Sequence, residues 1–253
     1  MVSIRTNNWK IDHIQGVLFD KDGTLIDSHI YWGRIIERRV NAIIEYYRLN
    51  LDTFPTICRT MGYDITRKKL LPEGPIALVS REEVIDIVVQ YLMAQKINAD
   101  QNEIASIFIR EHKIFLSELF QYTQILAGVR PFLCRLKDHG VKTAVVTTDA
   151  IQNTNNILSY LNLGHLFDLI IGKESTEEAK STGVPAQVAL HKLEISADRA
   201  ICVGDAPMDL IMAMKSGMKA GVGVTTGQLP ASCLREYSPY LADSLIEIEV
   251  LPE

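Results

Sequence analysis

The residues best suited to chemistry in this chain are two aspartates, Asp20 and Asp22, within the sequence FDKDGT at positions 19–24. They follow a short, continuous apolar run at residues 14–19, which is typical of a buried strand. Two carboxylates at the end of a buried strand repel each other and resist the loss of water, so the pair is costly unless a cation or a proton lies between them. The spacing therefore indicates a functional site rather than packing.

Other polar residues follow apolar runs in the same way. They are Thr147, Thr148 and Asp149 after a run at 143–147, Asp205 and Asp209 after a run at 200–203, and Lys180 in the polar loop before a helical pattern at 185–193. In open parallel sheets, ligands bind beyond the carboxyl ends of the strands, and we expect these residues to converge there.

Carboxylates, a hydroxyl and an ammonium at one sheet edge suit a magnesium ion together with a phosphate group. Mg²⁺ prefers hard oxygen ligands, and a threonine and a lysine neutralise phosphoryl oxygens during transfer. A calcium loop of the EF-hand type does not fit, because that loop needs glycine at its sixth position and glutamate at its twelfth. Counted from Asp20, these positions hold Leu25 and Tyr31.

The pattern of elements predicts an α/β fold with a doubly wound parallel sheet. Continuous apolar runs are expected when helices cover both faces of a sheet, and such runs alternate here with helical segments. The predicted strands are residues 14–19, 143–147, 169–171, 200–203 and 220–224, and the predicted helices are residues 129–140, 151–163, 185–193 and 209–216.

Residues 28–124 have a different texture, with long amphipathic helices predicted at 29–49, 81–97 and 100–122 and no strand-like run between them. We interpret this region as a helical domain inserted directly after the first strand. The expected core domain then consists of residues 1–27 and 125–253.

Composition places the chain among ordinary globular enzymes, with 47% hydrophobic and 23% charged residues. The formal net charge of −5 and the lack of a basic run argue against a nucleic-acid partner. Four widely separated cysteines offer no zinc-binding spacing. The N-terminal residues lack the apolar stretch of a secretory signal, and no apolar run approaches the length that crosses a bilayer. We expect a cytoplasmic protein with no membrane partner.

Together these motifs resemble the haloacid dehalogenase (HAD) superfamily, in the subgroup of phosphatases with a helical cap inserted after the first motif. The similarity is greatest to phosphoglycolate-phosphatase-like and β-phosphoglucomutase-like members and covers nearly the whole chain. The first family motif, D-x-D-G-T, matches residues 20–24, and the second, a strand ending in Thr or Ser, matches VVT at 145–147. The acidic motif G-D-x-x-x-D matches GDAPMD at 204–209. The lysine motif departs from the family, because Lys180 precedes STGVP instead of a proline-rich turn, and Lys173 is the competing candidate.

The resemblance implies a role for each motif residue. Asp20 is the nucleophile that forms an aspartyl-phosphate, and Asp22 is the general acid and base. The expected Mg²⁺ ligands are Asp20, Asp205 and Asp22, the last through its backbone carbonyl, with Asp209 in the surrounding shell. Thr147, Thr148 and Lys180 are the expected phosphate ligands. Two simpler interpretations stay open: Thr147 as a strand end, and Asp209 as an acid that faces a helix dipole.

The resulting hypothesis is a Mg²⁺-dependent phosphatase acting on a small phosphate monoester, of the phosphoglycolate or sugar phosphate type, through an aspartyl-phosphate. One alternative is a β-phosphoglucomutase-like phosphomutase, which uses the same covalent intermediate but excludes water. A more distant alternative is a non-catalytic module that binds phosphorylated ligands. The sequence identifies neither the substrate within these classes nor the oligomeric state.

Overall fold

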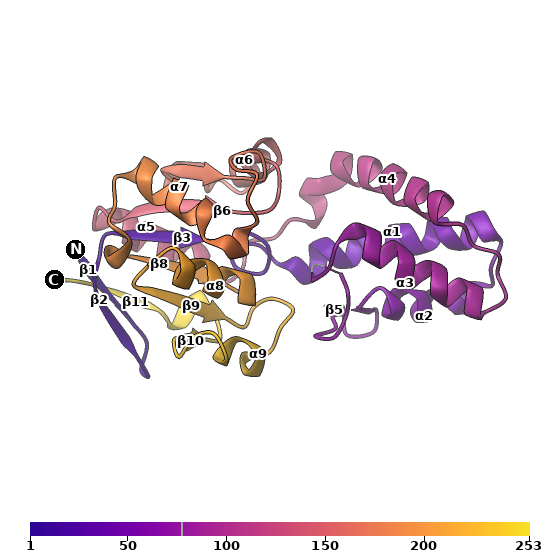
Figure 1. Ribbon diagram of the computed structural model, residues 1–253, viewed down its shortest axis with the longest axis horizontal. Helices are drawn as coiled ribbons and strands as arrows, with labels where there is room; N and C mark the ends of the chain where they lie inside the picture. The colour runs from indigo at the N-terminus through magenta and orange to yellow at the C-terminus, as the bar shows by residue number, and fades with distance from the viewer. Residues whose placement is uncertain (77) are drawn as a thin grey trace. The chain divides into compact units, whose positions relative to one another are not determined.

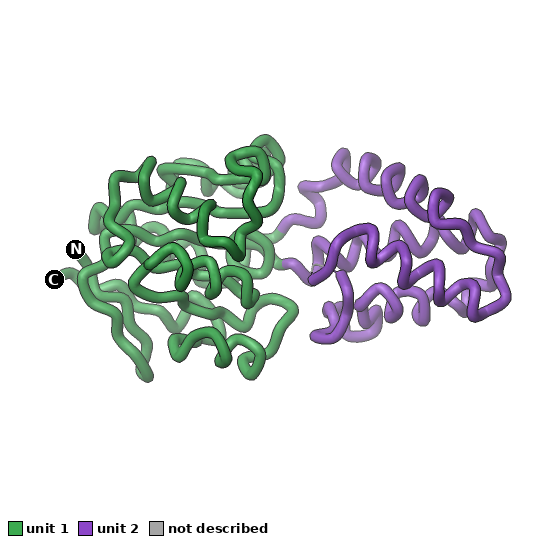
Figure 2. Tube along the Cα trace, viewed as in Figure 1, with its two compact units in different colours: residues 1–27, 124–253 green, residues 28–123 purple. Residues whose placement is uncertain are grey.

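The chain folds into two compact units, shown in separate colours in Figure 2. The computed structural model describes residues 1–76 and 78–253. One unit consists of residues 1–27 and 124–253, and the other of residues 28–123. The boundary after the insertion lies one residue before the one predicted from the sequence.

The larger unit is built on a six-stranded parallel sheet with the order β10-β9-β8-β3-β6-β7 (Figure 1). Its strands are β3 (Gly16–Phe19), β6 (Lys142–Val146), β7 (Leu169–Ile171), β8 (Ala200–Gly204), β9 (Ala220–Val224) and β10 (Leu241–Ala242). The helices of this unit are α5 (Val129–Asp138), α6 (Ile151–Tyr160), α7 (Val184–Leu193), α8 (Pro207–Lys215) and α9 (Ala231–Arg235). Short 3₁₀ turns are η3 (Gly164–Leu166), η4 (Lys180–Thr182), η5 (Ala197–Arg199) and η6 (Leu245–Glu247). The predicted α/β fold class is confirmed.

Helices bury both faces of this sheet, which is why its strands are continuously apolar instead of alternating. On one face, Leu18 packs in a cluster with Ala189 of α7 and Met212 of α8. Its neighbour Phe19 points to the opposite face, because successive strand residues alternate, and meets Phe132 of α5 edge to face at 6.0 Å between ring centroids.

The strand order brings the carboxyl ends of β3 and β8 together at a topological switch point. The chain proceeds from β3 to β6 and β7 on one side, then returns to β8 on the other side of β3. In register, Phe19 lies opposite Val145 of β6 and Val203 of β8. The next residues along these strands are the predicted site residues, and a switch point of this kind is the usual ligand site of such sheets.

A second, antiparallel sheet joins the two ends of the chain and was not predicted. It consists of β1 (Val2–Arg5), β2 (Lys10–Ile14) and β11 (Glu249–Pro252), in the order β11-β1-β2. The apolar run at 14–19 is therefore two elements, β2 and β3, separated at Gln15. Apolarity alone does not reveal this division, because Ile14 at the end of β2 and all four residues of β3 are buried.

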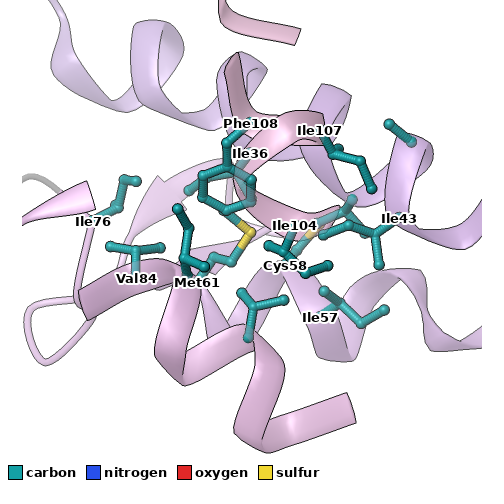
Figure 3. Close-up of a cluster of buried hydrophobic side chains, with 14 of the residues drawn as sticks. Ile36, Ile43, Ile57, Cys58, Met61, Ile76, Val84, Ile104, Ile107 and Phe108 are labelled. Atoms are coloured by element: carbon teal, nitrogen blue, oxygen red, sulfur yellow. The ribbon is translucent and has the colours of Figure 1, made fainter. Parts of the chain in front are cut away.

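The insertion is helical around its own apolar core, part of which is drawn in Figure 3. Its helices are α1 (Ser28–Tyr47), α2 (Phe54–Thr60), α3 (Arg81–Ala94) and α4 (Gln101–Glu118), with 3₁₀ turns η1 (Leu51–Thr53) and η2 (Leu119–Tyr122). Ser80 and Glu83 form a capping box that fixes the start of α3. The expectation of no strand in this region was wrong in one detail, because β4 (Tyr63–Asp64) and β5 (Lys69–Leu70), each two residues long, form an antiparallel hairpin. Among the described residues, no helix has the length and apolarity needed to span a membrane.

Candidate functional site

Lys180 and two aspartates form the centre of the charged cluster at the sheet edge. Asp20 directly follows β3, and its backbone N–H donates to the carbonyl of Val203 on β8. Lys180, at the start of η4, places its Nζ 2.5 Å from Asp20 Oδ1 and 2.5 Å from Asp209 Oδ1. Its side chain is 4% exposed, so this ammonium is held almost entirely by the two carboxylates.

The two carboxylate oxygens of Asp209 have different partners. Its Oδ2 accepts from the backbone N–H of Ala206 at the start of α8, which is the helix-end role left open by the sequence. Its Oδ1 meets Lys180. The carboxylate folds back onto Gly204, where a Cβ would collide with it. Glycine at the end of β8 is therefore required by the position of the Asp209 side chain.

Asp205 is clamped between two glycine-containing loops. A Cβ on Gly23 or on Gly227 would collide with its Oδ2, and its Oδ1 accepts from Thr24 Oγ1 at 3.3 Å. Thr226, next to Gly227, donates its hydroxyl to the carbonyl of Gly23 and so ties the two loops together. This cradle fixes the position of the Asp205 carboxylate.

The acidic cluster fits a divalent metal ion. One carboxylate oxygen from each of Asp20, Asp205 and Asp209 lies within 4.8 Å of the other two. Burial first, and the charges of Asp20 and Asp209 next, raise the pKa of Asp205 well above its usual range, and burial raises the pKa of Asp209 to about 6. The three carboxylates have one ammonium group among them, that of Lys180. Burial alone would lower the pKa of Lys180, but the charges of Asp20 and Asp209 raise it. The uncompensated negative charge and the hard oxygen donors suit Mg²⁺.

Asp22 lies outside this acidic cluster, and a buried lysine holds it. Lys21 has no exposed surface, and its Nζ lies 2.8 Å from Asp22 Oδ1 and 3.3 Å from Asp149 Oδ2. Burial raises the pKa of Asp22 and the Lys21 ammonium opposes that rise. Asp22 thus has an environment different from that of its neighbour Asp20, which is the condition for two carboxylates to take different roles.

A cavity of about 280 Å³ lies beside Lys180, lined also by Thr147 and Thr148. Thr147 directly follows β6, and its Oγ1 accepts from the backbone N–H of Asp149. Lys173 lines the same cavity at an exposed position and forms no ion pair with any residue that the structure describes. The geometry favours Lys180 over Lys173 as the lysine beside Asp20.

Two features of the site escaped the sequence analysis. The sequence predicts a strand at residues 220–224 and assigns no role to the glycine that follows, yet Gly227 closes over Asp205. Its position after β9, at the same sheet edge as the other site residues, was the available signal. The contact between Lys21 and Asp149 had no such signal, because the two residues lie 128 positions apart (149 − 21) and no local sequence pattern links them.

The fold and this cluster define a class: an α/β protein with a candidate nucleophilic aspartate, a buried lysine and an acidic cluster suited to a metal ion at the switch point of a parallel sheet. Residues 14–217 match the haloacid dehalogenase-like hydrolase family. The chain belongs to this family and is therefore a hydrolase.

Curated relatives are similar over most of their length. The PpaX protein of Caldanaerobacter subterraneus, named as a candidate pyrophosphatase, is 29% identical over 89% of this chain and 88% of its own. Phosphoglycolate phosphatase of Aquifex aeolicus is 27% identical over 82% of this chain and 84% of its own. The crystal structure of a predicted phosphoglycolate phosphatase from Haemophilus somnus matches with a TM-score of 0.70 at 20% identity, covering 93% of this chain and 96% of that one. The last likeness concerns the fold alone.

Proposed function

We propose that this protein is a Mg²⁺-dependent phosphatase that hydrolyses a small phosphate monoester through an aspartyl-phosphate on Asp20. The single observation that carries the proposal is the placement of Asp20 at the end of β3, in contact with Lys180 and within the acidic cluster. A carboxylate in this position has a cation at hand for the phosphoryl oxygens that it attacks.

In the first step, an oxygen of Asp20 attacks the phosphorus atom, and the bond from phosphorus to the ester oxygen breaks. Asp22 gives its proton to the departing oxygen, which leaves as the alcohol. In the second step, Asp22 takes a proton from water, the water oxygen attacks phosphorus, and Asp20 is released with inorganic phosphate. Thr147, Thr148 and Lys180 are assigned to the phosphoryl oxygens in both steps.

The metal would be held by Asp20, Asp205 and the backbone carbonyl of Asp22. When bound, Mg²⁺ supplies positive charge that offsets the repulsion between the nucleophilic carboxylate and the phosphate. Asp209 is assigned to the surrounding shell, because both of its oxygens are already engaged, one by Lys180 and one by the N–H of Ala206.

Candidate substrates come from the sequence hypothesis and from the names of the relatives. Phosphoglycolate and sugar phosphates are the monoesters that the sequence hypothesis favours, and the name of PpaX adds pyrophosphate as a second candidate. A panel of these phosphate compounds, assayed for released phosphate, ranks them by kcat/KM. Analysis of the carbon product with a hexose 1-phosphate distinguishes hydrolysis from mutase chemistry, since only a mutase yields the 6-phosphate.

The nucleophile is tested by Asp20→Asn in the hydrolysis of p-nitrophenyl phosphate with Mg²⁺, together with acid quenching to detect phosphate bound to protein. We expect loss of both turnover and the trapped phosphoprotein. Asp198→Asn is the matched control, because Asp198 is exposed in η5, before the amino end of β8. Full activity of Asp20→Asn would refute the assignment, and tight ligand binding by the wild-type protein without any turnover would favour a binding module.

A further inference from the structure

The most unusual side chain in the site is Lys21, because a lysine is rarely buried in full. The family motif leaves its position unspecified, as the x of D-x-D-G-T, and the sequence alone assigned it no role. Its side chain has no exposed surface in the folded chain. Burying an ammonium is costly unless it is paired, and here the carboxylates of the adjacent Asp22 and the distant Asp149 provide the pairing.

The second of these carboxylates, Asp149, is itself fixed by its surroundings. Its Oδ1 accepts from the backbone N–H of Ala150, and its Oδ2 accepts from Asn153 Nδ2 at 2.5 Å. Its backbone N–H donates to Thr147 Oγ1. Asp149 is therefore a rigid anchor on the loop after β6, and Lys21 Nζ, 3.3 Å away, is tied to that loop.

The first carboxylate, Asp22, receives the same ammonium on Oδ1, at 2.8 Å. A contact of this kind restrains the carboxyl group through one oxygen, and the proposed reaction uses the other, Oδ2. The arrangement resembles a catalytic triad: Lys21 orients the acid Asp22, and Asp149 in turn holds Lys21.

We infer that Lys21, anchored by Asp149, is a positioning residue that orients the Asp22 carboxyl for proton delivery to the leaving oxygen. The inference rests on the proposed function, in which Asp22 is the general acid. Lys21 touches no reacting atom; it acts through Asp22. The proton moves from Asp22 to the ester oxygen as the bond from that oxygen to phosphorus breaks and the bond from Asp20 to phosphorus forms.

The test compares two substrates that differ in their need for that proton. An alkyl phosphate, such as ethyl phosphate, has a poor leaving group that must be protonated, whereas p-nitrophenolate leaves without assistance. We expect Lys21→Met to lower kcat/KM for ethyl phosphate by ~10²-fold and for p-nitrophenyl phosphate by only a few-fold, since positioned general acids contribute about that much. kcat/KM is the appropriate constant because it reports on the phosphoryl transfer step in which the leaving oxygen is protonated.

A purely structural role for Lys21 predicts equal losses on the two substrates, and either equal losses or no loss would overturn the inference. Should Lys21→Met fail to fold, Asp149→Asn removes the anchoring charge with nearly the same shape and must give the same selective loss. Lys142→Met is the matched control, since it breaks an exposed pair of Lys142 with Asp168 at the amino end of β6. It should change neither constant.

Asp22→Asn separates a failure of this inference from a failure of the proposed function. If Asp22→Asn shows the selective loss and Lys21→Met does not, Lys21 has no positioning role while Asp22 stays the acid. If Asp22→Asn itself shows no selectivity between the substrates, the acid assignment falls and the inference is overturned with it. In the Asp22→Asn background, Lys21→Met should add no further selectivity, because its effect passes through the missing carboxyl group.

Discussion

The two units of the molecule treat buried charge in opposite ways. In the sheet unit, the buried ammonium groups of Lys21 and Lys180 each contact two carboxylates. In the insertion, Arg39 on α1 is 3% exposed, lies 4.2 Å from the ring centroid of Phe108 and forms no ion pair with any residue in 1–76 or 78–253. Burial, and next the nearby Arg81, lower the pKa of Arg39 to about 9.

This difference separates buried charges that belong to a functional site from a buried charge that the fold only tolerates. A set of buried, mutually paired charges is costly to assemble and is expected at a functional site. The cation of Arg39 in the insertion lies over the aromatic face of Phe108, and such a contact offsets a small part of its desolvation. Removing a buried cation should therefore harm the sheet unit and benefit the insertion.

The largest effect is expected from Lys180→Met. Activity on p-nitrophenyl phosphate should fall by ~10³-fold, because the phosphoryl group loses its nearest cation. Without Mg²⁺, the variant should also lose about 3–5 kcal/mol of unfolding free energy, since buried carboxylates are left without their partner. Steady-state kinetics and urea unfolding measure the two losses. Lys192→Met, an exposed change on α7, is the control, and wild-type behaviour of Lys180→Met in both assays would contradict the paired-charge account.

A smaller effect is expected from pH in the metal-free protein. The carboxyl of Asp209 has an ordinary pKa of 3.8 and, in the folded chain, a pKa of about 6. Between these values the folded chain binds more protons at Asp209 than the unfolded chain does. The contribution of Asp209 to the unfolding free energy is therefore complete below pH 3.8 and is lost as pH rises through 6. The raised pKa corresponds to a loss on the order of 3 kcal/mol.

Urea unfolding in EDTA across this pH range measures the decline. Asp209→Asn should remove that part of the slope, whatever its effect on the overall stability. Mg²⁺ should oppose the decline, because metal binding favours the ionised carboxylates. An identical slope in wild type and Asp209→Asn would show that Asp209 does not titrate in this window.

Gly227→Ala should act on the metal site without changing any charge. The added methyl group collides with Oδ2 of Asp205 and must displace that carboxylate, so we expect the Mg²⁺ affinity to fall ~10–100-fold. Mg²⁺ titration of activity measures it. Gly164→Ala is the matched control, because a Cβ there meets only Ser159 at 4.0 Å. Equal Mg²⁺ affinity in both variants would exclude the proposed cradle.

The smallest effect, with the opposite sign, is expected for Arg39→Met. The substitution keeps the aliphatic part of the side chain and removes an unpaired buried cation, so the unfolding free energy should rise by about 1 kcal/mol. Urea unfolding at neutral pH measures the change. Arg67→Met, at an exposed arginine of the same unit, should be neutral. Destabilisation by Arg39→Met would end the contrast between the two units.

Local sequence patterns were sufficient for most of the elements. The strands at 169–171 and 220–224 have the predicted bounds, β6 lies one residue earlier than predicted at both ends, and β8 is one residue longer at its carboxyl end. The short hairpin of the insertion and the sheet formed by the chain ends were not predicted. Such short strands depend on pairing with their neighbours more than on their own composition.

The sequence by itself determined the family, the α/β class and the residues placed after each strand, because apolar periodicity and motif spacing are local properties of a chain. Only the tertiary structure decided which charges meet. Lys180 contacts Asp20 across 160 positions, Lys21 is tied to Asp149, and Gly227 closes over Asp205. Such pairings follow from strand order and loop conformation. Coulomb energy and steric contact depend on distance in space, which the linear order of residues does not record.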